Sequence, residues 1–140
     1  MKRLAIAAAL LSATCGGGGG SGPTPSPTPV TETANYTGTT RSTSATTCTG
    51  DSHSFTAVDG SISITLLSTS TNENLTAQIC PPASQTCTLT RRQINVGQTI
   101  EAPRQGGTAQ VLSLLPLNCG TGAPPSPDPI TYNARVIYQR

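Results

Sequence analysis

Short runs in which apolar and polar residues alternate constrain the fold of this chain more than any other feature. Between residues 130 and 138 every second position is apolar or aromatic: Ile130, Tyr132, Ala134, Val136 and Tyr138. The same spacing recurs at residues 61–66 and 75–79. Because successive side chains of a β-strand point to opposite faces of the sheet, each run predicts a strand with one buried face. No stretch beyond the first fifteen residues shows sustained helical periodicity.

Three further runs are candidate strands, at residues 52–58, 98–102 and 108–115. In the last of them Val111 and Leu112 break the alternation, which predicts burial on both faces or a bulge. Turn-forming residues such as Asp59-Gly60 and Val96-Gly97 separate the runs. About eight short strands at this spacing predict an all-β domain, an antiparallel β-sandwich or jelly roll.

The first fifteen residues have the order of a secretory signal. Lys2 and Arg3 precede an apolar stretch at 4–13, which is too short to cross about 30 Å of hydrocarbon as a helix. Cys15 follows, and a run of glycines comes directly after it. This arrangement resembles a bacterial lipoprotein signal, in which Cys15 becomes the lipidated first residue of the mature chain. Ordinary cleavage after Ala13 is the alternative.

The lipoprotein resemblance implies a location and a domain organisation. It implies three acyl chains on Cys15, hence a stable membrane anchor, and Gly16 after the cysteine implies passage to the outer membrane of the bacterial cell envelope. The expected organisation is a signal peptide at 1–14, a tether at 15–34 and one domain at 35–140. The tether is rich in Gly, Ser and Pro, a composition typical of flexible and extended spacers.

The cysteine count agrees with this organisation. Of five cysteines, four remain if Cys15 carries lipid, enough for two disulfides in an oxidising compartment. Four cysteines permit three pairings, of which we favour Cys80–Cys87 across a short loop and Cys48–Cys119 over a long separation. The spacing contains no Cys-x-x-Cys pair and the chain has one histidine, so neither a metal site nor a cofactor is expected.

The charge balance excludes one class of partner. Eight basic residues include Lys2 and Arg3 of the signal, and the six that remain balance six acidic residues. A neutral mature chain with scattered arginines has no electrostatic footprint for nucleic acid. The neighbouring Arg91 and Arg92 fit a solvated strand edge, where charge discourages edge pairing.

Four segments carry a resemblance to a known family: Tyr36 to Gly38, Cys48 to Thr56, Asp59 to Leu66, and Ile130 to Val136. Read together they resemble the bacterial pre-peptidase C-terminal (PPC) domain, a small β-sandwich appended to many secreted peptidases. The family's late tyrosine-rich strand has no counterpart at 107–112, so the resemblance implies the fold and an accessory role, and no ligand-contacting residue is carried over.

The one histidine and the aspartates suggest two kinds of site. His53 with Asp51, Asp59 and nearby serines has the residue types of a hydrolase triad, but the chain lacks a Gly-x-Ser-x-Gly elbow. Asp51, Asp59 and Asp128 could bind calcium, although solvated turn residues are the simpler interpretation because they are not clustered in sequence. No catalytic residue is therefore predicted.

The expected function is that of a noncatalytic, lipid-anchored envelope protein whose domain is a binding or accessory module. Its partners would be the membrane, through the N-terminal lipid, and a glycan or envelope-protein ligand. The alternatives are a structural envelope component that acts through a protein partner, and a small secreted hydrolase using His53.

Overall fold

The structure is a computed structural model that describes residues 28–44, 46–58, 60–82, 86–104, 109–122 and 128–140. Its strands are β1 (Thr31–Ser42), β2 (Cys48–Gly50), β3 (Ser52–Thr56), β4 (Gly60–Thr69), β5 (Leu75–Cys80), β6 (Leu89–Ile94), β7 (Thr99–Arg104), β8 (Ala109–Pro116) and β9 (Ile130–Gln139). The described residues contain no helix that could cross a bilayer.

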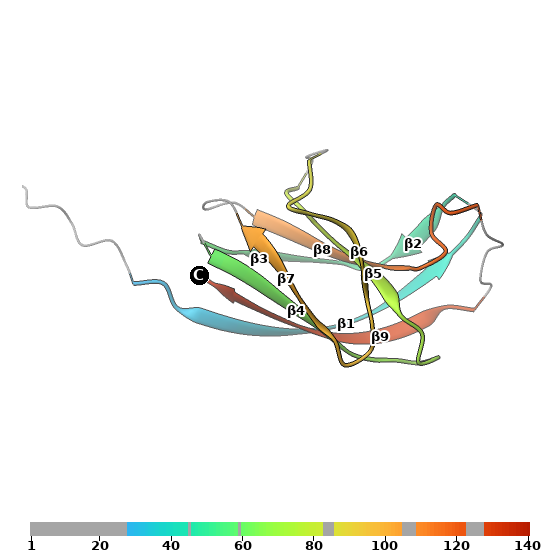
Figure 1. The fold of residues 1–140 in the computed structure, drawn as a ribbon, viewed down its shortest axis with the longest axis horizontal. Coiled ribbons are helices and arrows are strands. Elements are labelled where there is room, and N and C mark those ends of the chain that lie inside the picture. Colours follow the sequence, from blue (N-terminus) through green and yellow to red (C-terminus); the bar gives the residue numbers. More distant parts are fainter. Residues whose placement is uncertain (1–27, 45, 59, 83–85, 105–108, 123–127) are drawn as a thin grey trace, which may run out of the picture.

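The nine strands form two antiparallel sheets (Figure 1). One sheet has five strands in the order β2-β1-β9-β4-β7, and the other has four in the order β3-β8-β5-β6. The chain changes from the first sheet to the second between β2 and β3. The predicted all-β class and sandwich architecture are confirmed.

The alternating runs bury one face of each sheet, as predicted. Along β9 the burial alternates strictly from Ile130 to Tyr138, and β4 buries Ile62, Ile64 and Leu66 together with Thr65. The core between the sheets is completed from the second sheet by Phe55, Leu75, Ala77, Ile79, Leu89, Ile94, Leu112 and Leu114. Aliphatic side chains supply most of it, because the sequence contains few aromatic residues.

Strands β1, β2 and β6 have no counterpart among the alternating runs of the sequence, and the structure differs from the prediction in further details. Strand β1 begins at Thr31, inside the expected tether at 15–34, because its backbone pairs with β9 along its length up to Gln139. Strand β8 keeps a regular alternation through Val111 and Leu112 without a bulge, and the outward-facing Val111 is half-buried. The register shifts lie instead in the pairing of β4 with β9 and of β5 with β6.

The two ends of the sandwich are different in kind. At one end, here called the tether end, Val30 and Arg140 exchange both backbone hydrogen bonds, at 2.9 and 2.8 Å. The opposite end, here called the distal end, carries the connections at 43–47, 70–74 and 117–122 (Figure 1). The segment that leads back to Cys15 therefore enters at the tether end. Cys15 itself lies outside the described residues.

Both favoured disulfides are formed, one toward each end of the sandwich. Cys48–Cys119 joins the start of β2 to the segment after β8 at the distal end, with a Cα–Cα distance of 5.7 Å. Cys80–Cys87 joins the end of β5 to the residues before β6, with a Cα–Cα distance of 4.0 Å. The first closes a long stretch of chain and fixes the distal connections relative to each other.

Candidate functional site

His53 lies between the two sheets. It projects from β3, and its Nε2 atom is 2.9 Å from the hydroxyl oxygen of Tyr132 on β9. Its ring stacks on Tyr36 of β1, with ring centroids 4.5 Å apart and an interplanar angle of 17°. Because β3 belongs to one sheet and β1 and β9 to the other, these contacts join the sheets.

The hydrogen-bond directions around Tyr132 follow from its second partner. Its hydroxyl donates to the carbonyl oxygen of Asp51 at 3.3 Å, so the Nε2–H of His53 is the donor to the tyrosine oxygen. Burial lowers the pKa of His53, against the opposing influence of the Asp51 charge. Burial also raises the pKa of Tyr132 to about 12. Both groups are therefore neutral near pH 7.

Gly38 of β1 makes room for this tyrosine. It is the register partner of Tyr132, and a Cβ atom added to it would lie 2.6 Å from Cζ of the phenol ring. Any side chain at this position would push the ring away from His53. The glycine in the Tyr36-Thr-Gly38 segment thus has a packing role in this cluster.

Among the described residues, the candidate residues of a hydrolase triad do not form the hydrogen bonds of a triad. The Asp51 carboxylate accepts the backbone N–H of Thr39 at 2.8 Å, whereas His53 bonds Tyr132. Ser52 and Ser54 lie on the outer face of β3, and the Ser52 hydroxyl is 3.3 Å from that of Ser113. The His53 imidazole instead bonds the hydroxyl group of Tyr132. Asp59 lies outside the described residues.

The aspartates do not form a cation site in the described part of the chain. Asp51 and Asp128 are exposed, and no group of three or more His, Cys, Asp and Glu side chains comes together there to hold a metal ion. The calcium alternative therefore gains no support from these residues.

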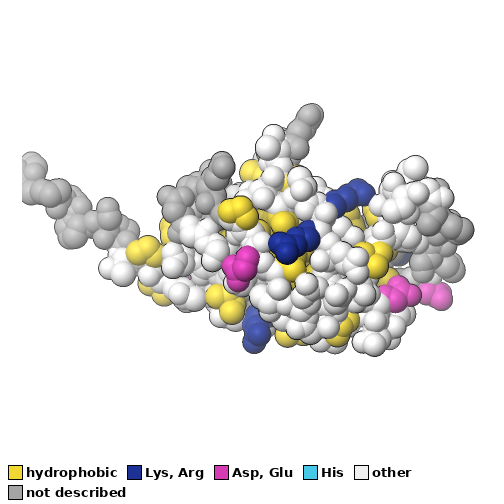
Figure 2. Space-filling model, viewed as in Figure 1, with side chains coloured by type: hydrophobic (Ala, Val, Ile, Leu, Met, Phe, Trp, Pro, Cys, Tyr) yellow, Lys and Arg dark blue, Asp and Glu magenta, His cyan; other side chains and the backbone are white. Residues whose placement is uncertain are grey.

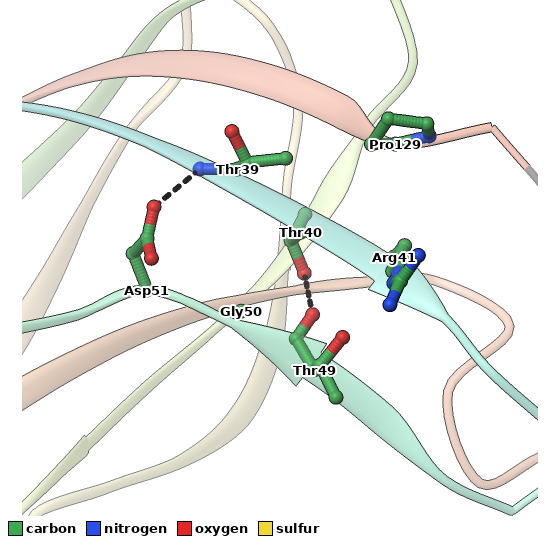
Figure 3. A pocket seen from close by; sticks show the side chains of 7 residues that line it. All are labelled: Thr39, Thr40, Arg41, Thr49, Gly50, Asp51 and Pro129. Carbon is green, nitrogen blue, oxygen red and sulfur yellow. Dashed lines mark hydrogen bonds between the residues drawn. The ribbon is translucent and has the colours of Figure 1, made fainter.

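A polar hollow of about 330 Å³ lies where β1 meets β2 (Figure 3). Its lining consists of Thr39, Thr40, Arg41, Thr49, Gly50, Asp51 and Pro129. We call it the β1–β2 hollow. It offers hydroxyl groups, one guanidinium and one carboxylate, so it can donate and accept hydrogen bonds with a neutral polar ligand. A second hollow of about 500 Å³ continues along β1 and β9 and shares Thr39 and Asp51 with it.

The walls of the β1–β2 hollow are fixed by short contacts. The Thr40 hydroxyl donates to the carbonyl oxygen of Thr49 at 3.1 Å, and the Asp51 N–H donates to the carbonyl of Thr39 at 3.0 Å. The Cys48–Cys119 disulfide fixes the start of β2 to the segment that follows β8. The lining is thus largely preformed, which lowers the entropic cost of binding a ligand.

Two arginines toward the distal end differ in whether their guanidinium group is bonded. Figure 2 shows scattered charged side chains on a mainly uncharged face. Arg41 is exposed, and in the described part of the chain its guanidinium has neither an ion pair nor a hydrogen bond. Arg91 on the edge strand β6 donates instead to the carbonyl oxygen of Cys119 at 2.9 Å. Arg41 is therefore the cation of the β1–β2 hollow that can meet a ligand.

Sequence reasoning named His53 and Asp51 but missed Tyr36, Gly38 and Tyr132 as their partners. One signal was available: the alternation placed Tyr132 on the buried face of its strand, and a buried tyrosine hydroxyl needs a hydrogen-bond partner. Comparison with protein families, curated proteins and solved structures gave no match for this chain. The resemblance to the PPC domain stays a prediction.

Proposed function

We propose that this chain is a lipid-anchored protein of the bacterial envelope whose β-sandwich is a noncatalytic binding module, with the β1–β2 hollow as its ligand site. The anchor would be Cys15 and the expected compartment is that of outer-membrane lipoproteins. The ligand would be an uncharged or weakly charged polar molecule, a glycan or a segment of an envelope protein.

The observation that carries this proposal is that the chain enters the domain at one end and the β1–β2 hollow lies toward the other end. The chain enters the domain at Val30, which is paired with Arg140 at the tether end. The β1–β2 hollow lies toward the other end of β1, at Thr39 to Arg41. A tether at one end of an elongated domain leaves the opposite end accessible to a ligand outside the membrane surface (Figure 1).

The chemistry of the hollow supports a polar ligand. Hydroxyl groups of Thr39 and Thr49, the Arg41 guanidinium and the Asp51 carboxylate offer both donors and acceptors. Sugar hydroxyls and peptide amides also combine donors and acceptors, and ligand sites orient such molecules with a few fixed polar groups. The surroundings of His53 support a noncatalytic role for the domain, because the imidazole ring bonds Tyr132 and stacks on Tyr36 of the opposite sheet.

The test is binding by the mature chain to glycan and envelope-protein arrays, with matched arginine variants. Arg41→Ala removes the cation of the β1–β2 hollow, whereas Arg135→Ala removes an exposed cation of β9 that does not line it. We expect Arg41→Ala to weaken capture about tenfold or more and Arg135→Ala to leave it unchanged. Absence of any array ligand, or equal effects of both variants, would contradict the proposed site.

A further inference from the structure

The outer edge of β1 is open over its N-terminal half. Strand β1 has 12 residues, whereas its neighbour β2 has 3 and covers only Thr40 to Ser42. Val30 and Arg140 exchange both backbone hydrogen bonds, so the even-numbered residues of β1 direct their backbone groups toward β9. The odd-numbered residues direct theirs away from β9, toward the edge.

Toward the N-terminus of β1, Thr39 is the last odd-numbered residue whose edge-directed backbone groups are bonded. Its carbonyl accepts the Asp51 N–H at 3.0 Å, and its N–H donates to the Asp51 carboxylate at 2.8 Å. Before it in the chain, the odd-numbered residues are Thr31, Thr33, Asn35 and Thr37. All four are exposed, and no strand or side chain among the described residues bonds their edge-directed backbone groups.

The other edges of the two sheets have features that discourage pairing with another chain. Edge strand β6 carries Arg91 and Arg92, edge strand β7 carries Glu101 and Pro103, and β2 and β3 are short, with 3 and 5 residues. Charges, prolines and short strands are the usual protections of sheet edges. The open edge of β1 has an uninterrupted register and only uncharged side chains at its four odd-numbered positions.

We propose that the open edge of β1 pairs with the same edge of a second copy of this chain, antiparallel and about a two-fold axis. Thr33 of one copy would lie opposite Asn35 of the other, and Thr31 opposite Thr37. Residues at these positions exchange both backbone hydrogen bonds, which joins the two five-stranded sheets into one.

The sequence of the edge favours a second copy as the occupant. In this pairing Thr31 lies opposite Thr37, and Thr33 lies opposite Asn35. Threonine has a high preference for strands, and its hydroxyl can bond a polar neighbour on the facing strand. The one charged residue in this half, Glu32, falls opposite Tyr36 of the other copy, so no like charges oppose each other. The edge is thus complementary to itself in both hydrogen bonding and charge.

The register is selected by the ends of the open edge. A shift by two residues in one direction would pair Thr31 with Thr39, whose edge groups are already bonded to Asp51. The opposite shift would pair Thr37 with Pro29, which has no backbone N–H to donate. Only the proposed register uses all four odd-numbered residues.

The arrangement is also compatible with attachment of both copies to one membrane. In this register the two Thr31 residues lie about 20 Å apart along the paired strands. A tether of the expected length and of Gly/Ser-rich and Pro-rich composition would span about that distance. The pairing itself rests on the strand geometry and does not require the lipid anchor or the ligand proposed above.

A cysteine variant tests the register. Ala34 would face Ala34 of the second copy at a non-hydrogen-bonded position, with Cα atoms about 4.5 Å apart, within disulfide range. In the mature chain with Cys15→Ser, Ala34→Cys should therefore give a covalent dimer on a nonreducing gel after mild oxidation. Thr33→Cys is the control, because its copies would lie about 7 to 8 Å apart and should yield at least about tenfold less dimer. Equal yields from both variants, or no dimer from Ala34→Cys, would overturn the proposal.

Variants with charges at the paired positions give an independent test. Dimerisation of the mature chain is measured by sedimentation at concentrations up to about 1 mM, where even a dimer with a dissociation constant of about 1 mM is substantially populated. Thr33→Lys with Asn35→Lys places like charges opposite each other and should raise the dimer dissociation constant about tenfold or more. Thr33→Lys with Asn35→Asp places opposite charges there and should retain the dimer. A wild-type monomer throughout, or the same result for both variants, would contradict the pairing. A mature chain that forms the dimer but binds no array ligand would contradict the ligand site proposed at the β1–β2 hollow and leave the pairing of β1 standing.

Discussion

The hydroxyl of Tyr132 and the Nε2 atom of His53 lie 2.9 Å apart and form a hydrogen bond between the two sheets of the sandwich. The bond joins β9, near the middle of one sheet, to β3, an edge strand of the other. Tyr36 stacks on the same imidazole and Gly38 leaves space for the phenol ring. This cluster gives a small core with few aromatic residues a specific polar contact between its layers.

Tyr132→Phe should destabilise the domain by about 1 to 3 kcal/mol, because it leaves the His53 imidazole and the Asp51 carbonyl without their partner. Tyr138→Phe is the matched control. Its hydroxyl donates to the partly exposed Glu32 carboxylate, so its loss should cost less than about 1 kcal/mol. Urea unfolding of the two variants measures the difference, and equal losses would contradict the structural role of the Tyr132 hydroxyl.

Acid should weaken the domain through His53. Burial lowers the pKa of this group in the folded state below its usual value of 6.5, so the unfolded chain binds the proton first. The contribution of neutral His53 to the free energy of unfolding is fully present above pH 6.5. It decreases as the pH falls from there toward the lower pKa of the folded state.

The measurement is the free energy of unfolding between pH 7 and 5, compared with that of His53→Gln, which stays neutral. Glu32, whose pKa is lowered by hydrogen bonds from Tyr138 and Arg140, changes stability only at lower pH. The wild-type curve should decline over this interval and the variant curve should be flatter. Parallel curves would show that His53 is not buried as described.

Gly38→Ala should cost more stability than Gly97→Ala, although Gly97 has a positive φ of 82° and Gly38 does not. A Cβ on Gly38 would collide with the ring of Tyr132, whereas a Cβ on Gly97 meets open space. We expect a loss of about 2 kcal/mol or more at Gly38 from displaced packing and about 1 kcal/mol at Gly97 from backbone strain. Thermal or urea unfolding can rank the two, and the reverse order would contradict the close approach of β1 to Tyr132.

The two disulfides should contribute unequally. Their sequence separations are 71 residues for Cys48–Cys119 and 7 residues for Cys80–Cys87. On the chain-entropy account these closures are worth about 4 and about 2 kcal/mol. Replacing both cysteines of one pair by serine and measuring unfolding in urea tests this order, and a larger loss from removing Cys80–Cys87 would contradict it.

Several strands and the Cys80–Cys87 disulfide could be predicted because their signals are local. Alternation at Ile130 to Tyr138 identifies a half-buried strand without knowledge of its neighbours, and a short loop between Cys80 and Cys87 favours their pairing. The start of β1 at Thr31 was missed because residues 31–33 are Thr, Glu and Thr, without an apolar residue. Pairing with β9, which is distant in sequence, makes that segment a strand.

The cluster around His53 and the β1–β2 hollow could not be derived in the same way. The His53 cluster depends on which strands adjoin across the sandwich, because it joins β3 to β1 and β9. The β1–β2 hollow depends on how the short strand β2 pairs with the end of β1 and on the position of Pro129. Local periodicity specifies neither arrangement. Sequence spacing placed Asp51 beside His53, but the change of sheet after β2 turns its carboxylate toward Thr39.

The central claim is that this sandwich is held at a membrane through Cys15. Mass spectrometry of the N-terminal peptide of the mature protein, isolated from bacteria that process the full chain, tests it most directly. The account predicts that the mature chain begins at Cys15 and carries a diacyl or triacyl adduct there. A chain with a free N-terminus at Thr14 and an unmodified Cys15 would contradict it.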